Sequence, residues 1–361
     1  MRVFKVLLAL LTLSIFIACS EDEDPSASVS VPQQFSVDIP PSLSSAAATG
    51  ISGREGDSDE VIEGEDIYEA LRYYIHLGEQ SAEILEITLI IASAFEQGNV
   101  VAISFVSDDD QREKRIDLVE NVTRGGNDYQ YEMTMVDTEN EDLALQLLWN
   151  TEPVEGIAIL NPYNLDRSDE EATQDAFYRI DYTEDHPDYE QAMTVSISGA
   201  EVEENGDIDN LKMFAGRNGD IVEVMGNSNH PNINIIDPDF IGGRNYAFVA
   251  RGDEVSDVAV VNLWLPPSDV STNDFDAGDE YSVFSVLEAE INAVTDGFFT
   301  EEEIASILSE ANSPAYFNSS GFITSGVDNK PASFSDTFVD LTGMTPFVPN
   351  DIQNLAVDFI Q

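Results

Sequence analysis

The clearest hydrophobic pattern in the chain lies in residues 65–97, where apolar side chains recur at helical spacing. Ile67, Leu71 and Ile75 are four residues apart, and acidic residues near the beginning complement the positive end of a helix dipole. Residues 84–95 are apolar on nearly every side, which is typical of a helix buried by its neighbours. The pattern predicts one long buried helix.

From residue 100 to about residue 265 the hydrophobic period changes from the helical value to two. Tyr129, Tyr131 and Met133, for example, alternate with polar residues. Glycine- and asparagine-rich turn signals separate the alternating runs, and this close spacing favours antiparallel strands with one wet face. The predicted strands are 100–106, 129–135, 143–149, 154–160, 178–182, 193–197, 211–215, 221–225, 245–250 and 257–265.

Residues 266–361 show a less regular pattern. Thr300 and Glu303 form a capping box that predicts a short helix through Ala311. A second short helix is expected to begin near Asn350 and to carry Ile352, Leu355, Ala356 and Phe359. No low-complexity linker separates this part, so residues 63–361 are expected to form a single globular domain.

Together these patterns predict an α+β fold. A mostly antiparallel β meander, in the form of a curved sheet or an incomplete barrel, would pack on the long buried helix 65–97, followed by the mixed region 266–361 with two short helices. In outline this resembles envelope lipid-carrier proteins of the lipoprotein-localisation type. The resemblance concerns the architecture and rests on no shared motif, so it does not assign an activity.

The first residues have the features of a bacterial export signal. A short positive region precedes an apolar run of 13 residues, Val6–Ala18, which is too short for a membrane-spanning helix of about 20 residues. The segment Ile15–Cys19 resembles a lipobox, although Phe16 stands where the pattern usually has Leu. The resemblance implies a signal peptide over 1–18, cleavage before Cys19 and lipid attachment to its sulfur. The alternative is an ordinary signal peptide followed by a chance cysteine.

Residues 19–62 are expected to form a flexible tether, because they are rich in Ser, Ala, Pro and acidic residues. The acidic cluster 21–24 resembles the signal that sends some Bacteroidetes-type lipoproteins to the cell surface. It also fits the general acidic bias of the chain. The expected location is therefore the cell envelope, with an outer-membrane anchor and a periplasmic or surface-exposed domain.

The charge balance excludes some partners. The chain has 15 Lys and Arg against 70 Asp and Glu, a net charge of −55. A nucleic acid requires a basic surface, and anionic lipid headgroups would repel this protein. Because salt screens self-repulsion, we expect adaptation to high ionic strength. With 42% hydrophobic residues the chain can still bury a core.

Few residues stand out as candidates for chemistry. His76, His186 and His230 have no neighbours at metal-ligand spacing. Arg251-Gly252-Asp253 spells an adhesion tripeptide that is expected by chance in so acidic a chain. Trp149 and Trp264 would line an apolar or sugar-binding groove or, as strand positions favour, the core.

Acidic clusters offer a weak calcium hypothesis. Asp274, Asp276 and Asp279 place hard oxygen ligands close together, as calcium requires. The spacing does not match an EF-hand, and a solvated acidic loop accounts for it more simply. No catalytic residue and no cofactor is predicted.

The sequence therefore predicts a lipid-anchored envelope protein that acts as a non-catalytic binding or structural module. Its partners would be the membrane, through Cys19, and an envelope protein or an apolar ligand. Two alternatives remain open. One is a carrier that holds an apolar ligand between the helix and the sheet, and the other is an envelope hydrolase that uses two carboxylates as acid and base.

Overall fold

A computed structural model describes the chain in several ranges. These are 30–32, 34–48, 64–98, 102–107, 110–168, 174–200, 208–231, 235–236, 243–268, 270 and 278–361, with the side chains of 83–98 and of Asp279 excepted. The predicted signal peptide, Cys19 and the first part of the predicted tether lie outside these ranges. So do the side chains of the apolar stretch 84–95.

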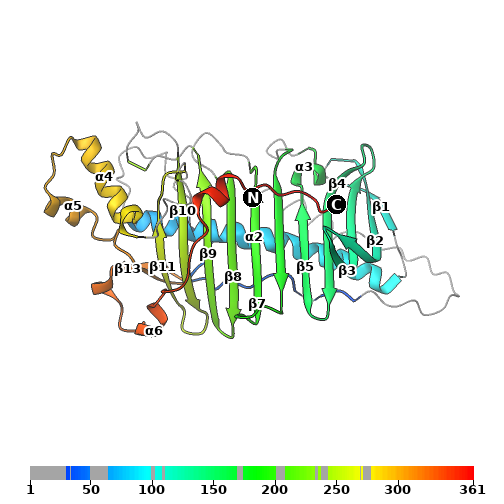
Figure 1. Cartoon of the computed structure of the whole chain (residues 1–361), viewed down its shortest axis with the longest axis horizontal. Helices are drawn as coiled ribbons and strands as arrows, with labels where there is room; N and C mark the ends of the chain where they lie inside the picture. The colour runs from blue at the N-terminus through cyan, green and yellow to red at the C-terminus, as the bar shows by residue number, and fades with distance from the viewer. Residues whose placement is uncertain are drawn as a thin grey trace. The chain divides into compact units, whose positions relative to one another are not determined.

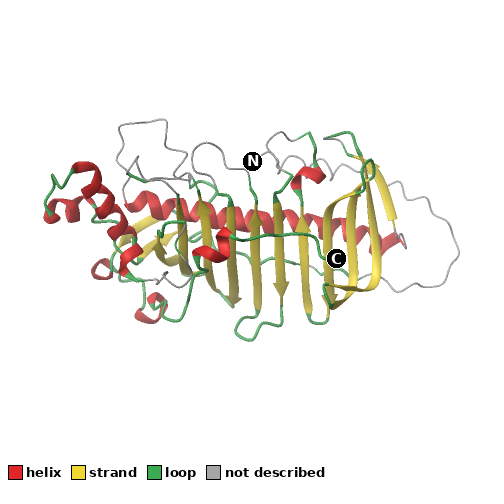
Figure 2. Cartoon of the chain, turned by 45° about the horizontal axis from the view of Figure 1, so that its top comes forward, coloured by secondary structure: helices red, strands yellow, loops and turns green. Residues whose placement is uncertain are grey.

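The described part of the chain contains a 13-stranded antiparallel sheet in which the strand order follows the chain (Figures 1 and 2). The sheet is not closed, and this confirms the predicted α+β meander. The strands are β1 (Ala102–Val106), β2 (Glu113–Arg124), β3 (Asn127–Asp137), β4 (Asp142–Thr151), β5 (Val154–Leu160), β6 (Phe177–Thr183), β7 (Gln191–Ser198), β8 (Asn210–Asn218), β9 (Ile221–His230), β10 (Arg244–Asp253), β11 (Val258–Trp264), β12 (Ala315–Asn318) and β13 (Gly321–Ser325).

The long predicted helix is present as α2 (Gly64–Gly98). The predicted capping box is also present, because Thr300 and Glu303 exchange hydrogen bonds at the start of α5. The last predicted helix is shorter than expected: it ends at Gln353, so Leu355, Ala356 and Phe359 follow it outside the helix. The other helices are α3 (Pro162–Leu165), α4 (Val283–Thr295), α5 (Glu301–Ile307), α6 (Asp336–Val339), α7 (Pro349–Gln353), and the 3-10 turns η2 (Asp279–Tyr281) and η3 (Val327–Asn329).

The chain divides into two compact units, whereas the sequence pattern predicts one globular domain. Unit 1 consists of residues 1–36, 80–193 and 357–361, and unit 2 of residues 37–79 and 194–356. The divisions fall inside α2 and β7. Each unit contains a buried apolar cluster of its own.

In unit 2, the first half of α2 packs across one face of the strands (Figure 1). Tyr68 stacks on Phe322 of β13 with ring centroids 6.3 Å apart. Further along the helix, the ring of Tyr74 packs against that of Tyr246 of β10, with ring centroids 5.1 Å apart. A Cβ atom on Gly78 would lie only 2.7 Å from Met213 of β8, so glycine allows the helix to approach the sheet closely.

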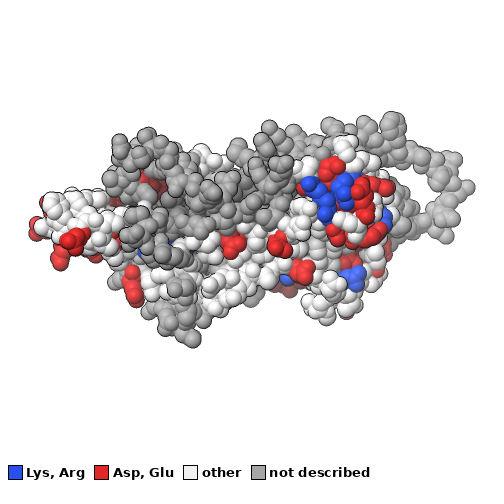
Figure 3. All heavy atoms as spheres, turned by 90° about the horizontal axis from the view of Figure 1, so that it is seen from above, with Lys and Arg blue, Asp and Glu red and all other residues white. Residues whose placement is uncertain are grey.

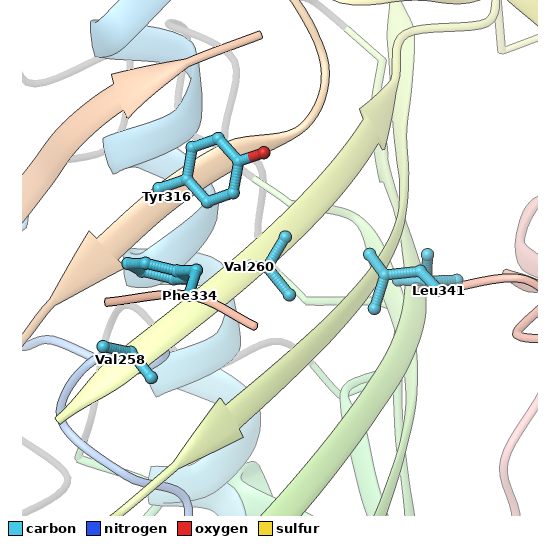
Figure 4. Packing of buried hydrophobic residues seen from close by; sticks show 6 residues of the cluster. Val258, Val260, Tyr316, Phe334 and Leu341 are labelled. Carbon is cyan, nitrogen blue, oxygen red and sulfur yellow. The ribbon is translucent and has the colours of Figure 1, made fainter. Parts of the chain in front are cut away.

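The opposite face of unit 2 carries a second apolar cluster (Figure 4). Val258 and Val260 of β11 lie beside Tyr316 of β12. The ring of Phe334 meets that of Tyr316 edge to face, with ring centroids 5.0 Å apart. Leu341 completes the cluster from the irregular segment that follows α6. Burial of such side chains stabilises the fold by about 25 cal/mol per Å² of apolar surface. Both faces of these strands are therefore covered.

Part of the predicted tether is folded. Phe35, Val37, Ile39 and Leu43 are all buried. In unit 1, the ring of Phe35 lies where a side chain on Gly156 would otherwise be, and in unit 2 Leu43 lies close to Gly252. The expectation of a flexible tether is thus wrong for residues 34–48, because alternate residues of this Ser- and Pro-rich segment supply apolar side chains that the sheet buries.

Candidate functional site

The most elaborate polar site among the described residues holds an extended segment of the chain against unit 1. It begins at the turn between β2 and β3, where Gly125 and Gly126 have φ values of +57° and +84°. A two-residue hairpin turn of this type needs positive φ, which glycine adopts without strain. The Gly125 N–H donates a hydrogen bond of 3.0 Å to the carbonyl of Gln361. A Cβ atom on Gly125 would lie 2.9 Å from Ile360 Cγ2.

Gln146 of β4 makes two hydrogen bonds to the main chain of one residue in this segment. Its Nε2 donates to the Ile360 carbonyl at 2.9 Å, and its Oε1 accepts from the Ile360 N–H at 2.8 Å. The amide thus offers the same donor and acceptor that a neighbouring strand would offer. Its side chain is buried, with 2% of Gln146 exposed.

A second set of contacts fixes the orientation of the Gln146 amide. Glu132 of β3, which is 3% exposed, accepts a hydrogen bond of 2.8 Å from Gln146 Nε2. Arg124 of β2 binds both oxygens of Glu132, at 2.9 Å and 2.6 Å. The hydrogen bonds that Arg124 donates to Glu132 raise the pKa of Arg124, which therefore stays charged. Because Glu132 requires a donor, Oε1 of Gln146 must face the N–H of Ile360.

Apolar contacts complete the site. The side chain of Ile360 packs against a buried cluster formed by Val122, Tyr129 and Leu148, against which the partly buried Ile157 also packs. The ring of Phe359 meets that of Phe177 edge to face, with centroids 5.4 Å apart. We call residues 357–361 the resident segment. The segment site is the set of sheet residues that hold it: Val122, Gly125, Tyr129, Gln146, Leu148, Ile157 and Phe177. The segment site recognises extended main chain together with an aromatic and an aliphatic side chain.

Unit 2 uses asparagine side chains in a similar way. Asn227 of β9 donates to the Phe347 carbonyl at 2.8 Å, and Asn210 of β8 donates to the Ile352 carbonyl at 3.0 Å. Asn245 of β10 in turn donates to Asn227 Oδ1 at 2.8 Å. Amides on the strands of this unit therefore also bind the main chain of a segment that lies on the sheet.

A charged cluster in unit 1 gathers several of the few basic residues. Arg112, Lys114 and Arg167 all contact the carboxylate of Asp137, which is 0% exposed. Lys114 also binds Asp110 at 2.9 Å. Figure 3 shows basic and acidic side chains gathered together on the face of the molecule seen from above.

The two carboxylates of this cluster are both ionised. Burial by itself would raise the pKa of Asp137, but hydrogen bonds from Arg112, the Glu139 backbone and Lys114 outweigh it and lower the pKa. For Asp110, burial is likewise outweighed by Lys114 and backbone donors, so its pKa is lowered too. An acid–base pair needs pKa values that are pushed apart. These two shift in the same direction, so the cluster is a structural one.

The three histidines occupy different surroundings. His230 is fully buried between Tyr74 and Tyr246, and its Nε2 lies 2.8 Å from the hydroxyl of Ser228. A nucleophile–base pair needs access for a substrate, which this burial denies. His76 is half-buried with Nδ1 3.2 Å from the Ser44 hydroxyl, and His186 lies in an exposed turn.

Other residues singled out by the sequence are placed as follows. Arg251 does not project as an adhesion loop, since it donates to Glu223 and to the carbonyls of Phe338 and Asp340. The indole N–H of Trp149 donates to the Ser30 carbonyl at 2.9 Å, and Trp264 packs beside the cluster of Figure 4.

The calcium hypothesis and the lipid site cannot be placed. Asp274, Asp276, the side chain of Asp279 and Cys19 lie outside the described residues, so both stay predictions. Within the described ranges, no three His, Cys, Asp or Glu side chains gather in an arrangement that would hold a metal ion.

Sequence reasoning did not find the segment site. The one available signal is Gln146 itself, a polar residue in the otherwise apolar run Leu143–Trp149. Its partner Ile360 is 214 positions away in sequence.

Comparison with protein-family models, curated proteins and solved structures gave no match. None of the helices in the described ranges combines the length and the apolar character needed to cross a membrane.

Proposed function

We propose that this chain is a lipid-anchored protein of the cell envelope that acts as a non-catalytic module and binds polypeptide in extended conformation. The observation that carries the proposal is the double hydrogen bond between the Gln146 side chain and the main chain of Ile360. An amide that binds the N–H and the C=O of one residue recognises the backbone itself, as an added strand does.

A second observation supports a preference for polypeptide. In unit 2, Asn227 and Asn210 bind the carbonyls of Phe347 and Ile352. In each unit, therefore, side-chain amides on the sheet hold main chain that lies across the strands rather than main chain paired within them. Polysaccharides without N-acetyl groups lack the amide N–H and C=O that Gln146 binds together in Ile360.

Cell-envelope attachment through Cys19 forms part of the proposal. The export pattern of residues 1–18 and the cysteine that follows support it. An outer-membrane anchor, with the folded part periplasmic or exposed at the surface, remains the location that we propose. We also propose adaptation to high salt, supported by the net charge of −55.

The two alternatives receive less support. For a carrier, an apolar cavity is needed beneath the helix, but in unit 2 Tyr74 and Gly78 lie directly against Tyr246 and Met213. For a hydrolase, two acids of different pKa must converge, whereas Asp110 and Asp137 are both held ionised by Lys114.

A binding assay that also detects any hydrolysis of the ligand tests the proposal. The full chain with Cys19→Ser, purified in high salt, would be incubated with a library of extended peptides and, in parallel, with peptidoglycan fragments. We expect saturable binding of peptides and no release of new reducing ends or amines. Release of products from the fragments would contradict the proposal. Metabolic labelling with an alkynyl fatty acid, with and without Cys19→Ser, checks the anchor.

A further inference from the structure

We propose that the segment site is an exchangeable peptide-binding site, occupied at rest by residues 357–361. Its ligand in trans would be an extended segment of an envelope polypeptide in which an aromatic residue is followed directly by an aliphatic one. This inference rests on the proposed function, and it names the site and the class of ligand.

The strand residues that bind the resident segment are oriented by contacts with one another, and these contacts do not involve the resident segment. Gln146 is oriented by Glu132, and Glu132 is bound by Arg124, all three from adjacent strands of the sheet. This chain of hydrogen bonds would persist if residues 357–361 moved away. A preorganised donor and acceptor lose little freedom when a peptide binds, which favours affinity.

The resident segment is attached by local contacts that a free peptide can reproduce. It lies outside the strands, and its main chain is held through Ile360 by Gln146 and through Gln361 by Gly125. Asp358 and Gln361 remain exposed. Segments attached in this way open at lower cost than strands inside a sheet.

The side chains of the resident segment define the ligand. Ile360 packs against the cluster of Val122, Tyr129 and Leu148, a surface that favours an aliphatic group. Phe359 presents its ring edge to face with Phe177, which favours an aromatic one. The pairing of Arg124 with Glu132 leaves the buried polar part of the site without net charge, so a charged side chain at position 360 would be disfavoured.

Deleting the resident segment tests the proposal. A chain that lacks residues 357–361 would be titrated with a fluorescein-labelled peptide of residues 356–361, and anisotropy would be recorded in high salt. We expect saturable binding to the deletion variant and at least tenfold weaker binding to the full chain, whose site is occupied. A peptide carrying Ile360→Asp should bind at least tenfold more weakly than the unmodified peptide. Equal binding of the two peptides would overturn the proposal.

A point variant separates the site from other surfaces. In the deletion variant, Gln146→Leu removes both main-chain hydrogen bonds while keeping an uncharged side chain of similar size, and Glu132 keeps its bonds to Arg124. We expect at least tenfold weaker peptide binding. The matched control is Gln353→Leu on α7, an exposed glutamine of unit 2, which should leave the affinity unchanged. Unchanged affinity in Gln146→Leu would also overturn the proposal.

A cleavable chain keeps the test decisive if the deletion variant fails to fold. A protease site placed after Asn354 would be cut in the folded protein, and labelled peptide would then be added. Exchange of the cut segment for the labelled peptide is expected. A native circular dichroism spectrum without exchange would overturn the inference.

Two further outcomes would show whether this inference fails while the proposed function stands. Binding of library peptides by the deletion variant without binding of the 356–361 peptide would overturn this inference and leave the proposed function in place. A dimer of the full chain that dissociates after Gln146→Leu would assign the site to a second copy of the chain and would overturn a different envelope polypeptide as its ligand.

Discussion

At the scale of single residues, long polar side chains hold the irregular segments in place. Arg251 illustrates this, since its guanidinium binds Glu223 and the carbonyls of Phe338 and Asp340. Hydrogen bonds to a charged group are worth about 1.5–3 kcal/mol each when the groups are shielded from water. The tripeptide that resembles an adhesion motif is thus a clamp on the loop around α6.

The clamp leads to a stability prediction. Arg251→Ala should lower the free energy of unfolding by about 2 kcal/mol, because it leaves carbonyls unpaired and Glu223 without its partner. Arg115→Ala is the control, since Arg115 pairs with Asp117 on a more exposed surface where solvent screens the ion pair, and its loss should shift the midpoint much less. Urea unfolding of both variants measures the difference, and equal midpoints would contradict the clamp.

The glycine of the β2–β3 turn gives a second prediction at this scale. Gly125→Ala adds a Cβ atom 2.9 Å from Ile360 Cγ2 and places a non-glycine residue at φ +57°. It should destabilise the full chain by about 1 kcal/mol or more. In the chain that lacks residues 357–361 the clash disappears, so thermal unfolding should show a smaller effect there. An equal effect in both chains would assign the whole cost to the backbone.

At the scale of elements, the ends of β2, β3 and α3 are joined by the charged cluster around Asp137. The folded-state pKa of Asp137 is lowered, so the carboxylate stabilises the fold fully at pH values above its unfolded pKa of about 3.9. That stabilisation is lost as the pH falls through the lower folded-state value. Asp110 contributes with the same sign.

Acid unfolding tests this cluster. Asp137→Asn should destabilise the protein by about 3 kcal/mol at pH 7, because Lys114 and two arginines lose a buried charged partner. As the pH falls below about 4, the difference between variant and parent should shrink, since the unfolded parent takes up a proton on Asp137 that the folded parent does not bind. Chemical unfolding between pH 7 and pH 3 measures this. A difference that stays constant with pH would show that the carboxylate charge contributes nothing.

The elements also show how far sequence reasoning reaches. Helix 65–97 and most of the strands were predictable because local periodicity encodes them, as Ile67, Leu71 and Ile75 do for α2. Strands β2, β12 and β13 were not predicted. The segment site was not, because residues 357–361 are too few to show a period and Gln146 carries no mark of its distant partner. The ordered structure of residues 34–48 was not predicted, because the segment is rich in Ser and Pro, although Phe35, Val37 and Ile39 alternate as strand residues do.

At the scale of the whole molecule, charge dominates. The chain has 70 acidic and 15 basic residues, and several of the basic ones are already committed to Asp137 and Glu132. Most of the acidic side chains therefore repel each other across water, a repulsion that extends about 30 Å at 0.01 M salt and about 3 Å at 1 M.

Stability should therefore rise with salt. We expect the melting temperature to increase steadily between 0.01 M and 1 M NaCl, through screening of net charge. Thermal unfolding followed by circular dichroism measures it, with equal ionic strengths of KCl as the control for ion identity. A lower melting temperature at 1 M than at 0.01 M would contradict adaptation to high ionic strength.

The order of the sheet has a consequence for how the chain folds. Because the strands pair in chain order, each new hairpin can form as soon as its second strand has been synthesised, and the entropy lost in closing each loop stays small. Ile360 must instead find Gln146 across 214 positions. Docking of residues 357–361 is thus expected to be the kinetically late step, so newly synthesised molecules should pass through a period in which the sheet is formed and the segment site is still empty.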